Sequence, residues 1–420
     1  MPSLLTRRQA LRLGGGAAVV GGLASQVRID PVNTWEPAPG TWPCDRYDLG
    51  NTAANPHTSL PSNPEPDWMT AVSGGRRFVV GPEHVFVSDD ETLTALGKRD
   101  GTTHWEVDVS PEPLVVHDGT LYHAHDGHLT ALDAETGHRR WRAGGDATRS
   151  GIGNLLVSTD TAIVTTGGSA SWVNPNLVAY DTRDGSRKWG YFGGRHGYVA
   201  LAAHDGFLYA NRSDGGIERY RRRSLLQAAT GLSLTRAWKR RYSGHWIVVA
   251  AERVLWGDFW IYATEQRPGI VALDPESGER VWGTLRPERY DSSRRNNYGA
   301  EIPAVDGDRL FVAVDVHIDD GPDFQELVTV SLADGEVLWC QPLPYISDVV
   351  EADGAVLVGV GYPDERERHR GTIRAFDSAT GRERWRAVTE YTPSWLAVAD
   401  GTVFALSSGS EREGYVVALR

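Results

Sequence analysis

Histidine and aspartate side chains, whose nitrogen and oxygen atoms can bind a metal ion, gather in two stretches of the sequence. In the run HAHDGH, His123 and His125 alternate on one face of an expected strand, as in some zinc sites, but the sequence places no acidic third ligand beside them. A second run, from Asp315 to Asp323, contains four aspartates with the hard oxygens that calcium prefers. Their spacing matches no known calcium loop and is more typical of a solvated acidic loop. The sequence also contains no motif of a serine hydrolase, a phosphate-binding loop or a zinc protease. It therefore predicts no metal ion and no catalytic residues.

A repeated phrase indicates which fold positions these side chains. The stretch GHLTALDAETGHRRW at residues 127–141 returns as GIVALDPESGERVW at 269–282 and as GTIRAFDSATGRERW at 371–385. Its common form is A-x-D-x-x-T-G-x-x-x-W. A catalytic motif rarely occurs in several copies in one chain, whereas a structural unit does. The phrase is therefore interpreted as architecture, and no catalysis is assigned to it.

Two β-type runs joined by a tight turn precede each copy of the phrase. LVVHDGTLYHAH precedes one copy and WLAVADGTVFAL precedes the last, and Asp-Gly between apolar runs is a strong hairpin signal. Each unit thus has four antiparallel strands. Successive tryptophans lie from 36 residues apart (Trp105 to Trp141) to 57 apart (Trp282 to Trp339). This period predicts an all-β fold, an eight-bladed β-propeller of four-stranded antiparallel blades over residues 41–420.

The last unit stops at GYVVALR, before its tryptophan, while Trp42 near the N-terminus follows no phrase. We therefore expect the N-terminal segment around Trp42 to supply the missing outer strand and to close the ring, which removes the open sheet edges. The tryptophans expected to dock between neighbouring blades are Trp42, Trp105, Trp141, Trp189, Trp238, Trp282, Trp339 and Trp385. The copy before Trp238 carries an insertion.

The phrase and its tryptophan-bearing closing strand resemble the tryptophan-docking motif of pyrroloquinoline-quinone-like repeat propellers, over about residues 41–420. The resemblance implies one of two functions. One branch of this family contains dehydrogenases with the quinone and calcium in the central channel, many of them with a disulfide between adjacent cysteines. The other branch contains non-enzymatic binding proteins, such as the outer-membrane assembly lipoprotein. Cys44 and Cys340 are far apart here, which favours the binding branch and no cofactor.

The loops on the two faces of the expected propeller differ in length. Turns inside the first and third hairpins of a blade are short, whereas the connections on the other face, such as TTGGSASWVNPN, vary widely. Variable loops on a rigid scaffold commonly carry function, so this loop-rich face is the expected binding face. The residues just before the innermost strands form the candidate ligand site at the channel mouth: Arg149, Arg195, His196, His245, Trp246, Asn297, Glu301, Tyr345 and Trp395. Such side chains suit a small polar ligand or a peptide. The alternative is that they only cap a solvated channel.

The first 25 residues place Arg7 and Arg8 before a Gly/Ala/Val/Leu stretch from Leu11 to Ala24, and they resemble a twin-arginine export signal. That stretch is shorter than the ~20 residues of a membrane-spanning helix. Residues 26–40 are proline-rich and are predicted to form a linker. The mature protein is thus expected to be extracellular or associated with the cell envelope, without a transmembrane span. The formal charge of -12 argues against a nucleic-acid partner.

Two functional hypotheses follow from the sequence. The leading one is an exported, non-catalytic scaffold that binds a protein, peptide or surface polymer through the loop-rich face. Its partner would lie in the cell envelope or the extracellular space. The alternative is a quinone- and calcium-dependent dehydrogenase that uses the central channel.

Overall fold

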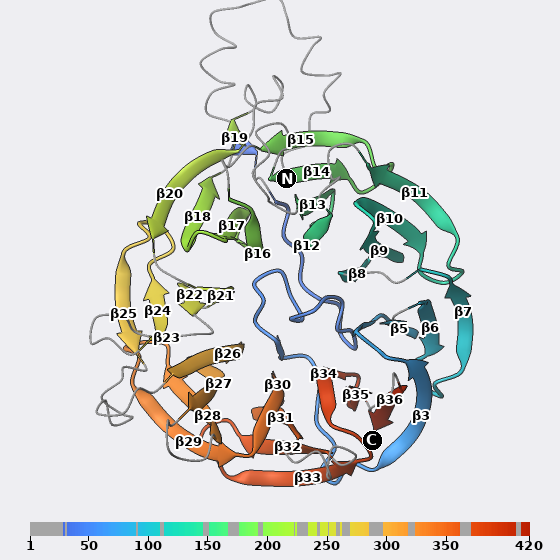
Figure 1. Cartoon of the computed structure of the whole chain (residues 1–420), viewed down its shortest axis with the longest axis vertical. Helices are drawn as coiled ribbons and strands as arrows, with labels where there is room; N and C mark the ends of the chain where they lie inside the picture. Colours follow the sequence, from blue (N-terminus) through green and yellow to red (C-terminus); the bar gives the residue numbers. More distant parts are fainter. Residues whose placement is uncertain are drawn as a thin grey trace, which may run out of the picture.

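Eight β-sheets surround a central channel like the blades of a propeller (Figure 1). The computed structural model describes residues 28–29, 32–89, 91–109, 113–145, 151–166, 176–191, 196–221, 223–224, 234–241, 244–250, 252–257, 261–262, 269–284, 297–317, 324–361, 371–408 and 413–420. The regular elements of these ranges are β-strands. Within them, no helix has the length and apolar character needed to cross a membrane. The predicted all-β, eight-bladed fold is confirmed.

Each blade has four antiparallel strands, of which the first lines the channel and the last lies at the rim (Figure 1). Blade 1 comprises β4 (Arg77–Val80), β5 (His84–Ser88), β6 (Leu93–Gly97) and β7 (Thr103–Val107), and blade 2 comprises β8 (Leu114–His117), β9 (Thr120–His125), β10 (His128–Asp133) and β11 (Arg139–Gly144). Blade 3 comprises β12 (Ile152–Val157), β13 (Thr161–Thr166), β14 (Leu177–Asp181) and β15 (Arg187–Tyr191), and blade 4 comprises β16 (Tyr198–His204), β17 (Phe207–Arg212), β18 (Gly216–Arg221) and β20 (Thr235–Arg241). Blade 5 comprises β21 (Trp246–Ala250), β22 (Arg253–Gly257), β24 (Ile270–Leu273) and β25 (Arg280–Thr284), and blade 6 comprises β26 (Asn297–Asp306), β27 (Arg309–His317), β28 (Phe324–Ser331) and β29 (Val337–Leu343). Blade 7 comprises β30 (Tyr345–Ala352), β31 (Ala355–Gly361), β32 (Gly371–Asp377) and β33 (Glu383–Thr389), and blade 8 comprises β34 (Pro393–Ala399), β35 (Thr402–Ser408), β36 (Glu413–Leu419) and β3 (Pro66–Ser73).

Four short strands add to this ring. β23 (Ile261–Tyr262) pairs with β26, and β2 (Ala54–Asn55) pairs in parallel with β30. β1 (Arg28–Ile29) pairs with β19 (Arg223–Ser224), which lies in the insertion before Trp238. Blade 4 keeps four strands despite this insertion.

The repeated phrase joins each blade to the next. Ala131 lies directly opposite Trp141 across β10 and β11, and its small side chain leaves room for the indole ring. The ring packs on the next blade, where a Cβ on Gly185 would lie 2.7 Å from the Trp141 ring, and Trp141 Nε1 donates a hydrogen bond to the Thr182 carbonyl at 2.9 Å. Gly185 also has a φ of +70°, which favours glycine. A contact of this kind recurs at several blade boundaries, including Trp105 against Gly137.

The structure corrects the expectation that Trp42 closes the ring. The outer strand of blade 8 is β3, which pairs antiparallel with the C-terminal β36 and places Trp68 opposite Ala418. The Trp68 ring lies against Gly101 of blade 1, where a Cβ would come within 2.5 Å of it, and Trp68 Nε1 donates to the Lys98 carbonyl. Trp42 is 2% exposed and instead bridges to Val80 inside the channel. The repeat pattern does not predict Trp68, because the phrase that belongs to this tryptophan is the one in β36, at the other end of the chain.

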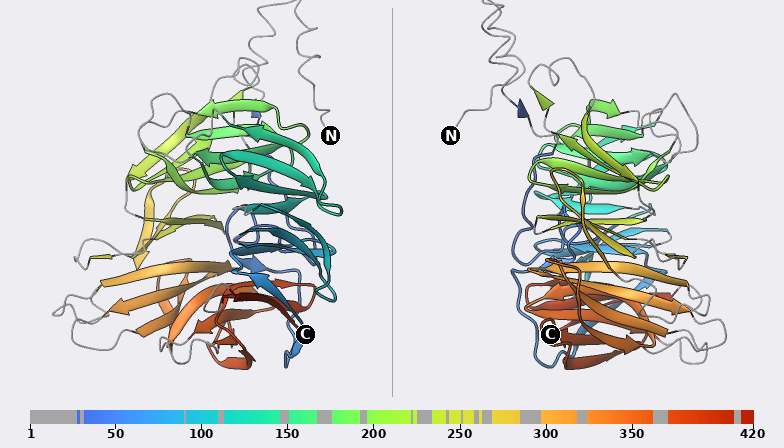
Figure 2. Two further views of the ribbon diagram at one scale, coloured as in Figure 1. Left: turned by 45° about the vertical axis from the view of Figure 1, so that its right-hand side comes forward. Right: turned by 90° about the vertical axis from the view of Figure 1, so that its left-hand side faces the viewer.

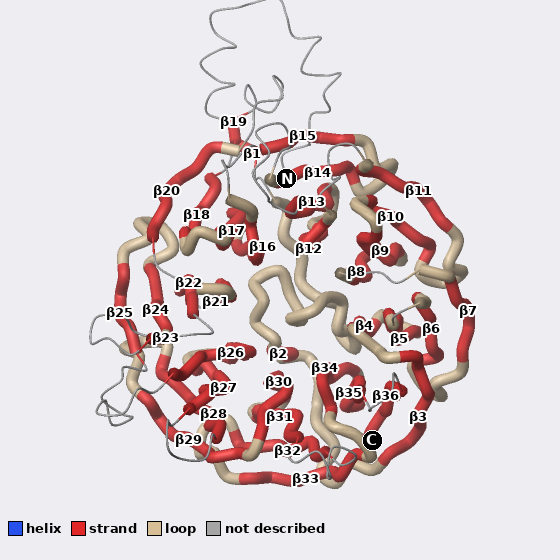
Figure 3. The backbone as a smooth tube through the Cα atoms, in the orientation of Figure 1, coloured by secondary structure: helices blue, strands red, loops and turns tan. Residues whose placement is uncertain are grey.

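Residues 32–55, called here the inner segment, run round the channel as an extended loop (Figure 3). They lie along one face of the disc (Figure 2), beside the ends of the innermost strands and the short turns that follow. Hydrogen bonds join the inner segment to every blade: Trp42 to Val80, Pro43 to Val116, Trp35 to Val157, Leu49 to Ala203, Gly50 to Val249, Thr52 to Val305, Ala53 to Glu351 and Asn55 to Val398. Part of the segment predicted as a linker, from residue 32 onwards, thus contacts the blades directly.

The contact between an indole and a glycine can be tested at Gly137. In Gly137→Ala, the new Cβ would lie 2.8 Å from Trp105 Cδ2 at a φ of +70°. We expect a loss of about 1 kcal/mol from the left-handed backbone and a further ~1–3 kcal/mol from overpacking. Gly307→Ala is the control, because Gly307 has a φ of +56° and no atom within 4 Å of its Cβ position. Urea unfolding measures both, and equal losses would contradict the docking role.

Candidate functional site

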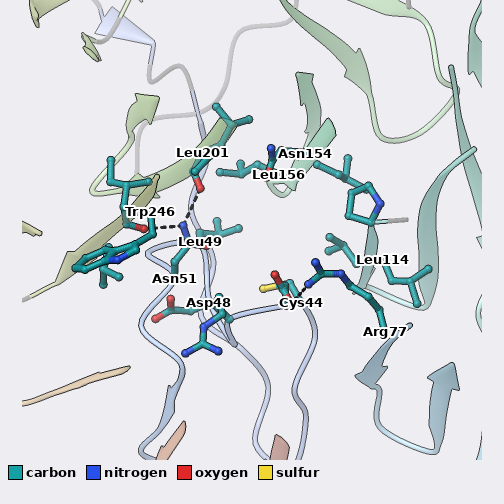
Figure 4. A pocket seen from close by; sticks show the side chains of 18 of the residues that line it. Cys44, Asp48, Leu49, Asn51, Arg77, Leu114, Asn154, Leu156, Leu201 and Trp246 are labelled. Carbon is teal, nitrogen blue, oxygen red and sulfur yellow. Dashed lines mark hydrogen bonds and ion pairs between the residues drawn. The ribbon is translucent and has the colours of Figure 1, made fainter. Parts of the chain in front are cut away.

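A cavity of about 320 Å³ lies at the channel mouth, above the inner segment (Figure 4). Its floor is formed by Cys44, Asp45, Arg46, Asp48, Leu49 and Asn51. Its walls come from the first strand of every blade, and they include Arg77, Leu114, Asn154, Leu201, Trp246, Pro303, Asp348 and Trp395. The inner segment therefore closes the cavity from below, and all eight blades hold its walls in place.

The structure places the residues predicted at the channel mouth in different positions. His245, Trp246 and Trp395 line the cavity. Tyr345 begins β30 and is 47% exposed, and His196 is exposed outside the cavity lining. Asn297 and Glu301 belong to β26, opposite His317 and Ala313 of β27, and their side chains lie outside the described part. Arg149 and Arg195 lie outside the described residues.

Sequence reasoning missed the floor of the cavity. The run CDRYDLGN was assigned to an outer strand, yet its polar residues have no strand alternation. Tyr47, Asn51 and Ala53 adopt positive φ angles of 72°, 62° and 51°, which a regular strand does not allow. The dense polar residues between Pro43 and Pro56 were the available signal for a loop in the channel.

Arg46 anchors the floor to blades 6 and 7. Its guanidinium lies 2.8 Å from Asp348 Oδ1 and donates to the carbonyls of Pro303 and Val349 at 2.7 and 2.8 Å. Asp348 also accepts hydrogen bonds from the backbone of Val349 and Leu396. Burial raises the pKa of Asp348, and the adjacent Arg46 opposes that shift. The pair thus holds a buried carboxylate by charge and by backbone donors.

Asp48 shapes the next turn of the floor. Its Oδ1 accepts hydrogen bonds from the backbone of Gly50 and Thr52 at 3.0 and 2.9 Å, and its Oδ2 accepts one from Thr52 Oγ1 at 2.7 Å. Burial raises the pKa of Asp48, and the Thr52 hydrogen bonds counteract part of this rise. Asn51, on the same turn, donates to the carbonyls of Leu201 and Ile247.

Arg77 lies at the rim of the cavity, between a carboxylate and an aromatic ring. Its guanidinium pairs with Asp45 at 2.6 Å and lies 4.2 Å from the centre of the Trp395 ring. Both members of this ion pair are substantially exposed to solvent. The rim therefore already accommodates a cation over an indole ring.

Trp246 has a packing role as well as a lining role. It lies opposite Gly257 across β21 and β22, and a Cβ on that glycine would come within 2.1 Å of its ring. The indole is 8% exposed, so little of it is available to a ligand. Trp256, which lies opposite Ile247 across the same two strands, is also buried.

The cavity offers little for nucleophilic or metal chemistry. Burial and the carboxylates of Asp48 and Asp45 raise the pKa of Cys44 well above its usual value, so the thiol stays protonated. Across the described ranges, no three His, Cys, Asp or Glu side chains are placed to share a metal ion. His123 is buried, and burial followed by the charges of His125 and Arg142 lowers its pKa to about 4. Three members of the acidic run, Asp319, Asp320 and Asp323, lie outside the described residues.

The cavity was compared with the needs of pyrroloquinoline quinone, a planar tricarboxylate. Its three carboxylates require several cations, yet Arg46 is held in a buried pair with Asp348, and only Arg77, in an exposed pair with Asp45, could turn to a ligand. Asp48 adds a further negative charge, which would repel the cofactor. The inner segment also occupies the channel below. The residues present therefore do not fit the quinone.

Comparisons with known proteins agree with the fold. The family profile described as outer membrane protein assembly factor BamB matches residues 58–284 and 266–420. BamB from Moraxella catarrhalis has a similar structure, with a TM-score of 0.57 and 17% identity over 85% of this chain and 97% of that one. A quinohemoprotein alcohol dehydrogenase from Pseudomonas putida has a TM-score of 0.65 and 13% identity, over 91% of this chain and 80% of that one. Sqt1 from Saccharomyces cerevisiae has a TM-score of 0.57 and 11% identity, over 93% of this chain and 99% of that one. No curated protein matches the sequence significantly.

The two arginines of the cavity should differ in their effect on stability. Arg46→Ala leaves Asp348, whose side chain is 2% exposed, without its cation, and we expect a loss of about 3–5 kcal/mol. Arg77→Ala breaks a pair whose members are 29% and 46% exposed, and about 1 kcal/mol or less should be lost. Chemical denaturation at pH 7 gives both values. Similar losses in the two variants would show that Arg46 is not the anchor.

Proposed function

The chain belongs to the propeller family of the outer membrane protein assembly factor BamB, and we propose that it is an exported, non-catalytic scaffold that binds a protein or peptide partner through its loop-rich face. A family described by protein assembly at the outer membrane favours a protein partner in the cell envelope. The arginine pair in the N-terminal segment, followed by a short apolar stretch, supports export.

The single observation that carries this proposal is the blind cavity at the channel mouth. It is closed below by the inner segment, it opens on the loop-rich face, and its walls come from all eight blades. A site held by so many strands changes little on binding, as in other preorganised interfaces. Its volume, about 320 Å³, is at the lower end of the ~300–1,000 Å³ of small-ligand sites. It therefore suits one long side chain or a short peptide end.

A dehydrogenase is the weaker alternative. It rests on a likeness of fold at 13% identity, and one fold hosts many functions. The paired arginines, the protonated Cys44 thiol and the filled channel all favour binding over redox chemistry.

Site-specific photo-cross-linking tests the binding face. The full chain carries a benzophenone amino acid in place of Tyr345, beside the cavity mouth, or in place of Leu338 on the outer strand β29. These positions are matched in exposure, at 47% and 48%. Illumination in an envelope extract should give a discrete protein adduct from position 345 and none from 338. Adducts of equal yield at both positions, or adducts from 338 alone, would contradict the proposal.

The melting temperature with pyrroloquinoline quinone and calcium separates the two functions. A cofactor present at a hundred times its dissociation constant stabilises a folded protein by about 2.7 kcal/mol. We expect no upward shift at saturating quinone. A clear shift would favour the dehydrogenase and count against the binding scaffold.

A further inference from the structure

The charges in the cavity do not balance. Two ion pairs account for four of the charged side chains that line it, namely Arg46 with Asp348 and Arg77 with Asp45. Asp48 is the remaining carboxylate of the floor. Its three hydrogen-bond donors are all uncharged groups of Gly50 and Thr52. Among the described residues, the lining therefore has a net negative charge centred on Asp48.

Asp48 also keeps the capacity to accept a further hydrogen bond. A carboxylate has about four acceptor positions, and the contacts of Asp48 use two on Oδ1 and one on Oδ2. Figure 4 shows its carboxylate on the cavity floor, with Cys44 between it and Arg77. A positively charged donor that reaches Oδ2 would occupy the fourth acceptor position of Asp48 and neutralise the charge of its carboxylate. Bonds of this kind are roughly twice as strong as neutral ones.

The walls of the cavity are mainly apolar, although Asn154, His245, Ser347 and Ser394 also line it. The apolar wall residues include Leu114, Leu156, Leu201 and Val248. Arginine and lysine combine an apolar stem with a charged end, so they match a site with apolar walls and a carboxylate floor. A neutral apolar side chain would bury Asp48 without a partner, and an acidic one would be repelled by it.

The rim shows that this part of the channel can hold a guanidinium. Arg77 lies between Asp45 and the Trp395 ring, at 2.6 Å and 4.2 Å. Because this pair is exposed, a partner's cation can compete for Asp45 and Trp395 at little cost. The chain's net charge of -12 also favours the approach of a basic partner.

We propose that the cavity receives an arginine or lysine side chain of the partner, with its charged end on Asp48 and its stem along the leucine walls. This inference rests on the proposed binding function and names the chemistry that the loop-rich face recognises. The partner is a protein with an exposed basic residue at its contact site.

Blocked tripeptides test the proposal on the full wild-type chain. Acetyl-Gly-Arg-Gly-amide is compared with the citrulline peptide, which has nearly the same shape without the charge, and with the glutamate peptide. Calorimetry is done at pH 8, because burial raises the pKa of Asp48 and a higher pH favours its ionised form, and at low salt, which limits screening of the charge. The arginine peptide should bind with one-to-one stoichiometry in the millimolar range or tighter, and the citrulline and glutamate peptides at least tenfold more weakly. Equal binding of arginine and citrulline, or no saturable binding of arginine, overturns the proposal.

Asp48→Asn locates the site. It should weaken binding of the arginine peptide at least tenfold, while Asp334→Asn, at an exposed turn of blade 6, should leave it unchanged. Arginine binding of unchanged strength in a folded Asp48→Asn variant overturns the assignment. If the Asp48→Asn variant fails to fold, the binding of the arginine and citrulline peptides to the wild-type chain still tests the cation site. If arginine and citrulline peptides bind equally while position 345 still gives a protein adduct, the cation site is overturned and the binding scaffold is retained. If position 345 also gives no adduct, both proposals are overturned.

Discussion

The hydrogen bonds between the inner segment and the eight innermost strands are the contacts on which the rest of the molecule depends. A propeller of separate sheets has an open channel whose innermost strands expose backbone groups, and unpaired groups of this kind are costly when buried. Residues 33–55 satisfy them blade by blade, at Val80, Val116, Ala203 and the other strand ends. The same segment then continues into β3, which completes blade 8. One stretch of chain therefore fills the channel and closes the ring.

This arrangement also determines the chemistry of the mouth. Arg46 and Asp348 are buried together, so their charges are used to hold the floor in place. Asp45 and Arg77 are exposed, and their pair can exchange partners with solvent or with a ligand. Asp48 is constrained by its own turn and carries a charge that neither pair balances. The proposed recognition of a basic side chain rests on this rigid floor and its one unbalanced carboxylate.

The sequence predicted the architecture, and three of the residues it places at the channel mouth, His245, Trp246 and Trp395, line the cavity. The A-x-D-x-x-T-G-x-x-x-W phrase is local, so its spacing gave the four-stranded blades, their number and the contact of Trp141 with its neighbour. Trp246 begins β21 and Trp395 lies near the start of β34, so a search at the entry of the innermost strands reaches both residues. Trp68 and the floor residues were missed for a different reason. Their partners lie hundreds of residues away, as with Arg46 and Asp348, and no local pattern records such a contact.

The pairing of β3 with β36 has a consequence for biosynthesis. The strand β3 (Pro66–Ser73) leaves the ribosome long before its partner β36 (Glu413–Leu419) has been made. Blade 8 therefore assembles only after β36 has been made, because contacts this distant in sequence form late. Until then, β3 presents an unpaired edge. A variant that lacks β36 would leave β3 and β35 without the strand that lies between them, so the ring would open at this one blade.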